Sequence, residues 1–304
     1  MTAEIDTPTA SSAAPAARAG RRLPAAMVAW FQAAPLALVL GAFLVLPIIM
    51  IVIVSFWGAT EYSIYPAFQF DNYQFLFGSP VTYKVFFNTF KYALITWAAT
   101  LLIGFTVAYF LAFHVRSLTW QVALFLLCTI PFWTSNIIRM ISWIPFLGRN
   151  GIANSTLISW GVIDEPLDWL LFSDFSVILA FVHLYTLFMV VPIFNTMMRI
   201  DRSLIEASYD AGATGWQTLW HVIVPLTKPG IMIGTIFVIT LVMGDFITVR
   251  FMSGSQSANV GRLISNDIGL LQYPSAAATA VVLLITVLLV IGILLRFVDI
   301  RKEL

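Results

Sequence analysis

The stretch DRSLIEASYDAGATGWQTLWHVIVPLTKP, Asp201 to Pro229, is a long polar-punctuated segment between two apolar runs, and the prediction of the fold starts from it. Ser203 and Glu206 have the S-x-x-E spacing of a capping box, in which each side chain satisfies an unpaired backbone N–H of the first helical turn. The spacing therefore predicts a helix from Leu204 onward. One face of this helix carries mostly small side chains, at positions Leu204, Ala207, Ser208, Ala211 and Gly215. Another protein surface can approach such a face closely.

Glycine and proline divide the second half of the same stretch. Gly212 and Gly215 predict positions at which the chain turns with a positive φ, since glycine has no Cβ to oppose that conformation. A short second helix is expected from Gly215 to about Val222. Pro225 and Pro229 are expected to end it, because proline lacks the N–H that a helix interior requires.

This stretch resembles the cytoplasmic coupling loop of ABC importer permeases, whose signature is an E-A-A triplet, a glycine six residues after its Glu, and an I-x-L-P further along. Ser208 replaces the third residue of the triplet and Val224 replaces the Leu, so small and apolar character is kept. The resemblance implies that the loop docks on an ATPase subunit, with Glu206 near basic residues of that subunit and Gly212 permitting the turn. The residues that carry the match are Glu206, Ala207, Ser208, Asp210, Gly212, Ala213, Ile223 and Pro225.

Two further stretches, Pro131 to Ser155 and Gly244 to Ile268, resemble the spermidine/putrescine branch of these permeases. The resemblance extends over Leu36 to Leu295 and implies an all-α, type I importer permease-like fold. It also implies four kinds of partner: two copies of an ATP-binding subunit, a second homologous permease, an extracytoplasmic solute-binding protein and a polyamine cargo. Ferric ion, thiamine and phosphonate are alternative cargoes in the same family.

The composition independently indicates a membrane protein, because 60% of the 304 residues are hydrophobic and only 10% are charged. A helix needs about 20 apolar residues to cross a bilayer. Six runs reach or approach that length and predict a polytopic permease domain over residues 34–304. The predicted spans are 34–57, 87–113, 118–140, 176–195, 230–252 and 276–297, with the coupling loop at 197–229.

Residues 1–33 are rich in Ala, Pro, Ser and Thr and predict a disordered basic tail on the cytoplasmic side. Of the sixteen Lys and Arg residues, ten lie in the segments that this arrangement places inside. Basic residues are enriched in cytoplasmic loops, so the bias predicts that both termini and the coupling loop face the cytoplasm of a bacterial inner membrane. A net charge of +1 gives no indication of a nucleic-acid partner.

No arrangement of residues predicts catalysis by this chain. ATP hydrolysis requires a phosphate-binding loop with its Lys, and no Gly-Lys pair occurs in the sequence. Three His and one Cys, far apart, do not predict a metal site, and no cofactor is expected. Cys128 lies in an apolar run and is interpreted as a structural thiol. The chain is therefore predicted to be a non-enzymatic subunit whose energy comes from a partner.

Asp245 is the most informative charge in the apolar runs, because a carboxylate inside the bilayer costs about 2.5 to 3.5 kcal/mol on insertion scales. That cost favours a position facing a water-filled translocation path. An ion pair with Arg250 or Arg139 that only fixes helix packing is the alternative. Arg139 is a second candidate, as a gate or a packing residue. Aromatic candidates for a cation path, which fit an interfacial belt equally well, are Trp133, Trp143 and Tyr185.

Two other classes of protein fit parts of the sequence. A self-sufficient secondary carrier or channel would use Asp245 as an ion site, but the two halves show no matching pair of interrupted helices. A purely structural membrane subunit would leave the coupling motif without a role. Dependence of transport on an ATPase partner separates the importer from both.

Overall fold

The computed structural model describes residues 25–60 and 63–296 of the chain. Internal contacts divide the chain into two units, Met1–Met50 and Ile51–Leu304. The first unit contains α1 (Ala25–Leu40), a π-helical turn (Gly41–Val45) and the start of α2 (Leu46–Val54). Residues 1–24 of the predicted N-terminal tail lie outside the described residues. Residues 25–33, which were also predicted to be disordered, belong to α1 instead.

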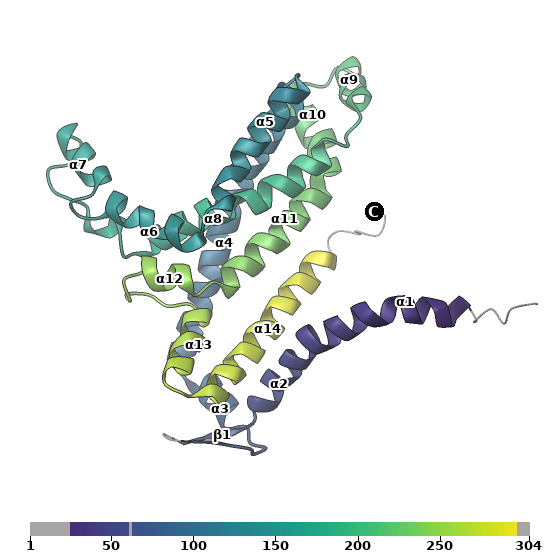
Figure 1. Ribbon diagram of the computed structural model, residues 1–304. Coiled ribbons are helices and arrows are strands. Elements are labelled where there is room, and N and C mark those ends of the chain that lie inside the picture. Colours follow the sequence, from purple (N-terminus) through teal and green to yellow (C-terminus); the bar gives the residue numbers. More distant parts are fainter. Residues whose placement is uncertain (1–24, 61–62, 297–304) are drawn as a thin grey trace, which may run out of the picture. The chain divides into compact units, whose positions relative to one another are not determined.

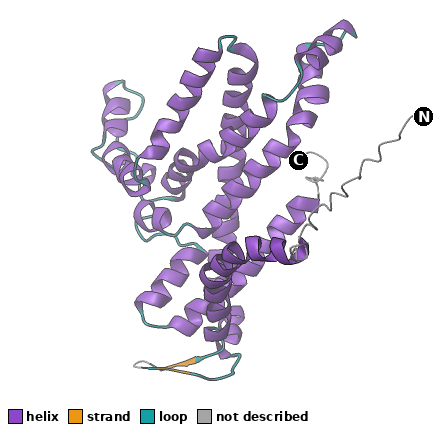
Figure 2. Cartoon of the chain, turned by 45° about the vertical axis from the view of Figure 1, so that its right-hand side comes forward, coloured by secondary structure: helices purple, strands orange, loops and turns teal. Residues whose placement is uncertain are grey.

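The second unit is almost entirely helical (Figures 1 and 2). Its two short strands, β1 (Gly58–Ala59) and β2 (Ile64–Tyr65), pair in antiparallel register with Gly58 opposite Tyr65. The helices are α3 (Asp71–Gly78), α4 (Pro80–Tyr109), α5 (Leu118–Thr129), α6 (Asn136–Leu147), α7 (Ile152–Ser159), α8 (Asp174–Met197), α9 (Arg202–Asp210), α10 (Gly215–Thr218), α11 (Val224–Gly244), α12 (Ile247–Met252), α13 (Val260–Gly269) and α14 (Tyr273–Arg296). Single π-helical turns occur at Phe110–His114 and Leu219–Ile223, and 3-10 turns at Ile130–Trp133 and Asp168–Leu170.

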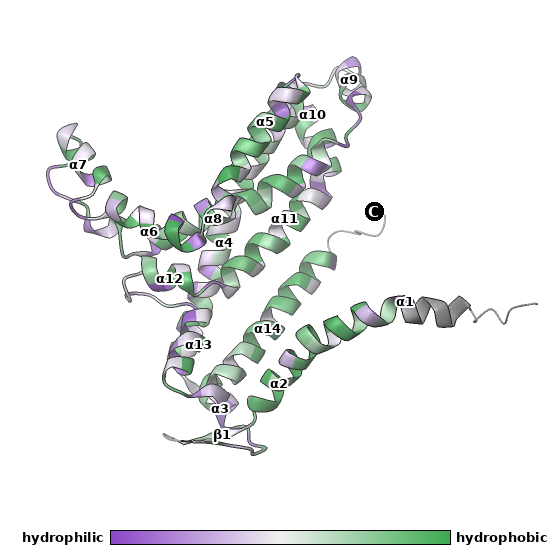
Figure 3. Ribbon diagram, viewed as in Figure 1, coloured by the Kyte–Doolittle hydropathy of each residue, from purple (hydrophilic) through white to green (hydrophobic). Residues whose placement is uncertain are grey.

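Within the described residues, five helical segments are long and apolar enough to cross a membrane, and a bent pair provides a sixth candidate. Figure 3 shows hydrophobic residues along most of α5, α11 and α14, with hydrophilic residues concentrated at their connections. The five segments are Gln32–Val54, Pro80–His114, Asp174–Met197, Gly215–Gly244 and Tyr273–Arg296, and the bent pair is Leu118–Trp133 with Asn136–Ser159. The fold is thus the all-α, polytopic one predicted from the apolar runs.

The core of the second unit lies where α4, α8 and α11 pack together. Met189 of α8 is fully buried at this junction. Two glycines allow the neighbouring backbones to approach it. A Cβ on Gly104 of α4 would lie 2.9 Å from Met189 Cγ, and a Cβ on Gly234 of α11 would lie 2.6 Å from Met189 Sδ. Glycine at both positions therefore sets the close spacing of the three helices.

We expect Gly234→Val to destabilise the helix bundle, because the added side chain meets Met189 and the backbone of α8. Overpacking of this kind costs about 1–3 kcal/mol. Thermal unfolding of the purified protein in detergent measures the effect. Gly292→Val in α14 is the matched control, since a Cβ there meets nothing within 4 Å. Equal melting temperatures for the two variants would contradict the packing role of Gly234.

The predicted third span, 118–140, is not one continuous helix. The α-helix ends at Thr129, a 3-10 turn continues to Trp133, and α6 begins after Ser135. The two arms are bent by 88°. Pro131 and the extended backbone at Thr134 account for the break, because proline removes a helical hydrogen bond and ψ of 153° at Thr134 leaves the helical region.

The expectation that Pro225 and Pro229 end the second helix of the loop is wrong, because a single helical segment runs over Gly215–Gly244. A π-helical turn at Leu219–Ile223 widens the helix immediately before Pro225, which then occupies the first turn of α11, where its missing N–H is tolerated.

The C-terminal end of α11 also differs from the predicted span 230–252. The helix stops at Gly244, Asp245 is extended (φ −83°, ψ 109°), and α12 starts at Ile247.

Candidate functional site

The predicted docking loop begins at α9, and Asp201 caps its N-terminus. Its carboxylate accepts a hydrogen bond from the Ser203 N–H over 2.9 Å, so the helix starts at Arg202. The predicted capping box of Ser203 with Glu206 is therefore wrong. Asp and Ser are both strong N-cap residues, and Asp201 comes first in the chain. The hydrogen bond from Ser203 also lowers the pKa of the Asp201 carboxyl.

Gly212 ends α9 in a Schellman motif. Its φ is +86°, its N–H donates to Tyr209 O over 2.8 Å, and the Ala213 N–H donates to Ser208 O over 3.1 Å. These two bonds satisfy carbonyls that the end of a helix would otherwise leave free. The predicted positive φ at Gly212 is thus confirmed. Gly215 does not share it, because it is the first residue of α10 and has helical geometry.

Side-chain bonds hold α9 against α10. Ser208 Oγ and Thr218 Oγ1 are 2.9 Å apart, and Thr214 and Gln217 form a capping box at the start of α10. Most of the motif residues remain exposed on the resulting surface, whereas Ile223 is buried beneath it. An open depression of this surface is lined by Ser208, Ala211, Gly212, Ala213, Gln217 and His221. The exposed motif residues are Glu206, Ala207, Asp210, Gly212 and Pro225.

We expect Asp201→Ala to loosen the first turn of α9, because the Ser203 N–H loses its acceptor. Asp201→Asn is the control, since an amide oxygen also caps a helix. Because the pKa of Asp201 is lowered by the cap, its contribution to stability is present above the unfolded pKa and is lost as pH falls through the folded pKa. Amide hydrogen exchange of residues 202–206 in both variants and across acidic pH measures these effects. Faster exchange in Asp201→Asn as well would count against capping.

Asp245 directly follows Gly244, the last residue of α11, the helix that continues from the loop. Its carboxylate is partly exposed and accepts three hydrogen bonds: from Tyr185 Oη over 2.7 Å, from the Thr248 N–H over 3.0 Å and from Thr248 Oγ1 over 2.5 Å. Its backbone oxygen accepts from Asn259 Nδ2 over 2.8 Å. Asp245 therefore connects the end of α11 to α8, to the first turn of α12 and to the start of α13.

The predicted alternative, an ion pair of Asp245 with Arg139 or Arg250, is not present. In the part of the chain that the structure describes, ion pairs join Lys91 to Asp174 and Arg149 to Asp168. Hydrogen-bond donors without formal charge thus satisfy the Asp245 carboxylate. The Asp245 carboxylate, whose two oxygens accept only from neutral donors and which is partly exposed, can still attract a cation.

Arg139 and Trp143 lie together on α6, beside a cavity of about 370 Å³ between α4, α5, α6 and α8. Trp143 Nε1 donates to His183 Nδ1 over 3.0 Å. Trp133 belongs to neither the cavity nor the Asp245 network and is 85% exposed. Four of the five predicted path residues thus lie near one another: Asp245 bonds Tyr185, Arg139 shares a helix with Trp143, and Arg139 and Tyr185 are close enough to interact electrostatically. Trp133 lies apart from them.

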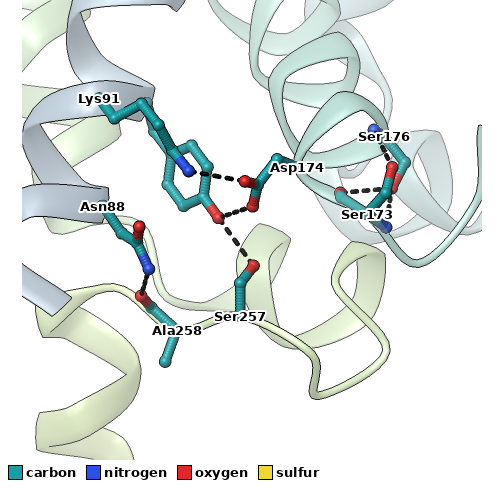
Figure 4. Close-up of polar contacts among 8 residues, drawn as sticks. Asn88, Lys91, Ser173, Asp174, Ser176, Ser257 and Ala258 are labelled. Atoms are coloured by element: carbon teal, nitrogen blue, oxygen red, sulfur yellow. Dashed lines mark hydrogen bonds and ion pairs between the residues drawn. The ribbon is translucent and has the colours of Figure 1, made fainter. Parts of the chain in front are cut away.

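A polar network that the sequence analysis missed joins α4, α8 and the loop after α12 (Figure 4). Lys91 Nζ lies 2.6 Å from Asp174 Oδ2, and the buried Tyr92 hydroxyl donates to Asp174 Oδ1. The Tyr92 hydroxyl also lies 2.7 Å from Ser257 Oγ, and Asn88 Nδ2 donates to the Ala258 carbonyl over 3.1 Å. The sequence does contain a signal for this network. The basic Lys91 and the acidic Asp174 lie at the starts of two predicted spans.

No group of three His, Cys, Asp or Glu side chains is placed to hold a metal ion among the described residues. The two ends of the α11 helix offer groups suited to recognition. One end presents an exposed loop with a fixed turn. The other end holds a hydrogen-bonded carboxylate that is partly open to solvent.

Comparison with known proteins gives consistent similarities. Residues 121–303 match the family described as binding-protein-dependent transport system inner membrane component. The chain is 34% identical to the spermidine/putrescine transport system permease protein PotB of Escherichia coli strain K12, over 83% of this chain and 90% of that protein. It is 29% identical to the PotB protein of Haemophilus influenzae, over 84% and 88% of the respective lengths.

Solved structures show the same fold. The first match is a chain in the crystal structure of a bacterial alginate ABC transporter in complex with alginate pentasaccharide-bound periplasmic protein. The TM-score is 0.72 at 16% identity, covering 91% of this chain and 96% of that one. At this identity the match bears on the architecture alone.

Proposed function

This chain belongs to the family of binding-protein-dependent transport system inner membrane components and is a permease component of an ABC importer, and we propose that its cargo is a polyamine, spermidine or putrescine. The observation that carries the choice of cargo is the 34% identity to a spermidine/putrescine permease over 83% of the chain. Membership of this family argues against the two other classes that fit parts of the sequence, a secondary carrier and a purely structural subunit. Ferric ion, thiamine and phosphonate are the cargoes that the test must exclude.

The proposed importer contains an ATPase subunit in two copies, a second homologous permease and an extracytoplasmic solute-binding protein. This chain is proposed to carry no enzymatic activity of its own. The exposed surface of α9 and α10 is the proposed contact with the ATPase. Its support is the cap at Asp201, the turn at Gly212 and the Ser208–Thr218 contact, which together hold small side chains outward in a fixed geometry. A preformed surface loses less conformational entropy on docking than a flexible loop does.

Asp245 is the proposed contact of the cargo along the path, and Tyr185 is proposed to hold its carboxylate in place. A cation that leaves water for a low-dielectric channel loses hydration, and a fixed carboxylate offsets part of that loss. The Tyr185 ring is buried and packs against Phe181 and Phe188, so this residue supports the site through the bond from its hydroxyl to the carboxylate. One carboxylate with aromatic neighbours attracts a polyamine without holding it too tightly for release.

The proposed topology has six crossings with both termini and the α9–α10 loop in the cytoplasm, the bent α5–α6 pair counting as one crossing. The bias of basic residues supports it. We expect reporter fusions after Arg116, Arg202 and Lys302 to show cytoplasmic activity. Fusions near Asp71, Asp164 and Ser257 should show the external pattern, and a swap between the two sets would contradict the arrangement.

Uptake tests the cargo directly. The chain is expressed with its ATPase, second permease and solute-binding protein in cells that lack other polyamine importers, and uptake of labelled spermidine and putrescine is measured. We expect ATP-dependent uptake that unlabelled polyamines compete and that ferric ion, thiamine and phosphonate do not. Uptake of one of those three, with no polyamine uptake, would overturn the proposed cargo and leave the importer class intact.

A further inference from the structure

Arg139 carries a buried positive charge without a carboxylate partner in the described part of the chain. The residue is only 7% exposed. Its Nη2 donates to the neutral Asn136 Oδ1 in the same helix, and its Nε has no hydrogen-bond partner. Neither of the two ion pairs in the described residues includes it. The guanidinium therefore has unused donors and an uncompensated charge.

Such a charge is unfavourable inside a protein or a bilayer, where charged groups pair with one another or face water. Breaking a buried pair by removing one partner is strongly destabilising, because the remaining charge stays buried. Among the described residues, Arg139 is in the position of one member of such a pair whose partner is missing. Its missing acceptor is expected to come from outside these residues.

The cavity beside Arg139 indicates where that acceptor enters. Its walls on α4 and α8 are mostly apolar and include Ile103, Val107, Leu179 and Val190, with His183 and Thr186 as the polar side chains of the α8 wall. Along α8 the cavity extends from residue 179 to residue 190, in the middle of the candidate span Asp174–Met197. At 1.5 Å per residue these positions lie roughly 8 to 24 Å from the first residue of α8.

This depth distinguishes between possible occupants. Lipid headgroup phosphates lie at the bilayer surface, so they are poorly placed to reach the middle of a span. A polyamine is cationic and does not complement a guanidinium. An apolar helix that carries one carboxylate complements both the apolar walls and the charge.

Resting on the proposed importer, in which this chain pairs with a second permease, we infer that Arg139 is the docking point for an Asp or Glu side chain in a span of that second permease. The carboxylate enters the cavity between α4, α5, α6 and α8 and pairs with the guanidinium of Arg139. Neutralisation of the guanidinium also removes a charge that would repel a cationic cargo.

The test is copurification of the complete importer with affinity-tagged Arg139→Met. We expect about a hundredfold weaker association with the second permease, as loss of one partner of a buried ion pair predicts. Arg139→Gln, which can still donate to Asn136, should show the same loss. Arg149→Met is the matched control, because Arg149 forms an ion pair on an exposed surface and should assemble normally.

Rescue identifies the partner residue. Each acidic residue in the spans of the second permease is changed to its amide in the Arg139→Met background. We expect one such change to restore assembly, because removal of both charges leaves no buried charge unpaired. Absence of any rescuing change would overturn the inference.

Three other outcomes would also overturn it. Normal assembly of Arg139→Met with loss of bound phospholipid by mass spectrometry would assign the cavity to a lipid. Copurification of the unmodified chain with only a second copy of itself would exclude a distinct permease. Failure of both Arg139 variants to insert when expressed alone would assign Arg139 to the folding of this chain.

Failure of the unmodified chain to bind any ATPase or permease would contradict the proposed importer instead of the inference about Arg139.

Discussion

Gly212→Asp is expected to abolish polyamine uptake while the chain still inserts into the membrane. Gly212 has φ +86° and closes the Schellman motif at the end of α9. A residue with a Cβ costs roughly 1–2 kcal/mol in this left-handed conformation. The added carboxylate would also project from the surface proposed to contact the ATPase, where an added Cβ has open space around it. ATPase activity in the assembled importer should no longer respond to the solute-binding protein.

Two further variants separate docking from folding. Gly212→Asn keeps the left-handed turn at lower cost, since Asn tolerates that conformation. It should therefore retain the fold of α9 by hydrogen exchange and still reduce uptake through its side chain. Gly269→Asp is the matched control, at a helix end with free space and no positive φ. Normal uptake in an inserted Gly212→Asp variant would count decisively against docking through this turn.

Asp245→Asn is expected to reduce uptake per assembled complex by about tenfold or more. At an effective dielectric constant of 20, a carboxylate attracts a unit charge 4 Å away by about 4 kcal/mol, and 1.4 kcal/mol corresponds to a factor of ten. The amide keeps an oxygen that can accept from Tyr185 or Thr248, so insertion and assembly should persist. Asp245→Glu should retain more activity than Asp245→Asn.

Tyr185→Phe distinguishes the charge from the network around it. This variant removes the 2.7 Å bond to Asp245 but leaves the carboxyl group and the buried aromatic ring in place. Uptake should therefore fall less than in Asp245→Asn. Equal losses in the two variants would mean that the hydrogen bonds and not the charge are needed. Since the carboxylate forms no ion pair with Arg250, neutralising Arg250 should not restore uptake to Asp245→Asn.

The sequence predicted the crossing helices and the turn at Gly212 because both depend on local chemistry. Apolar length sets the spans, and a glycine after helical turns is the commonest signal for a left-handed cap. The choice between Asp201 and Ser203 as the cap was not predictable in the same way. Both residues suit the role and lie two positions apart, and local patterns place a helix end only to within one or two residues.

Other features depend on contacts that no local pattern records. The π-helical turn at Leu219–Ile223 has no residue signature, yet it allows the helix to pass Pro225. The bonds from Tyr185 and Thr248 to Asp245 join α8 to the start of α12 across the helix break. Lys91 and Asp174 are 83 positions apart in the chain, so their ion pair follows from the packing of α4 on α8.

The uninterrupted helical segment Gly215–Gly244 has a mechanical consequence. At 1.5 Å per residue, its 30 residues form a rod about 45 Å long. A tilt of about 5° around the end that carries the loop displaces the opposite end by about 4 Å, more than the length of a hydrogen bond. Leverage of this kind would convert a small rotation at α10 into a displacement large enough to separate the Asp245 carboxylate from Tyr185.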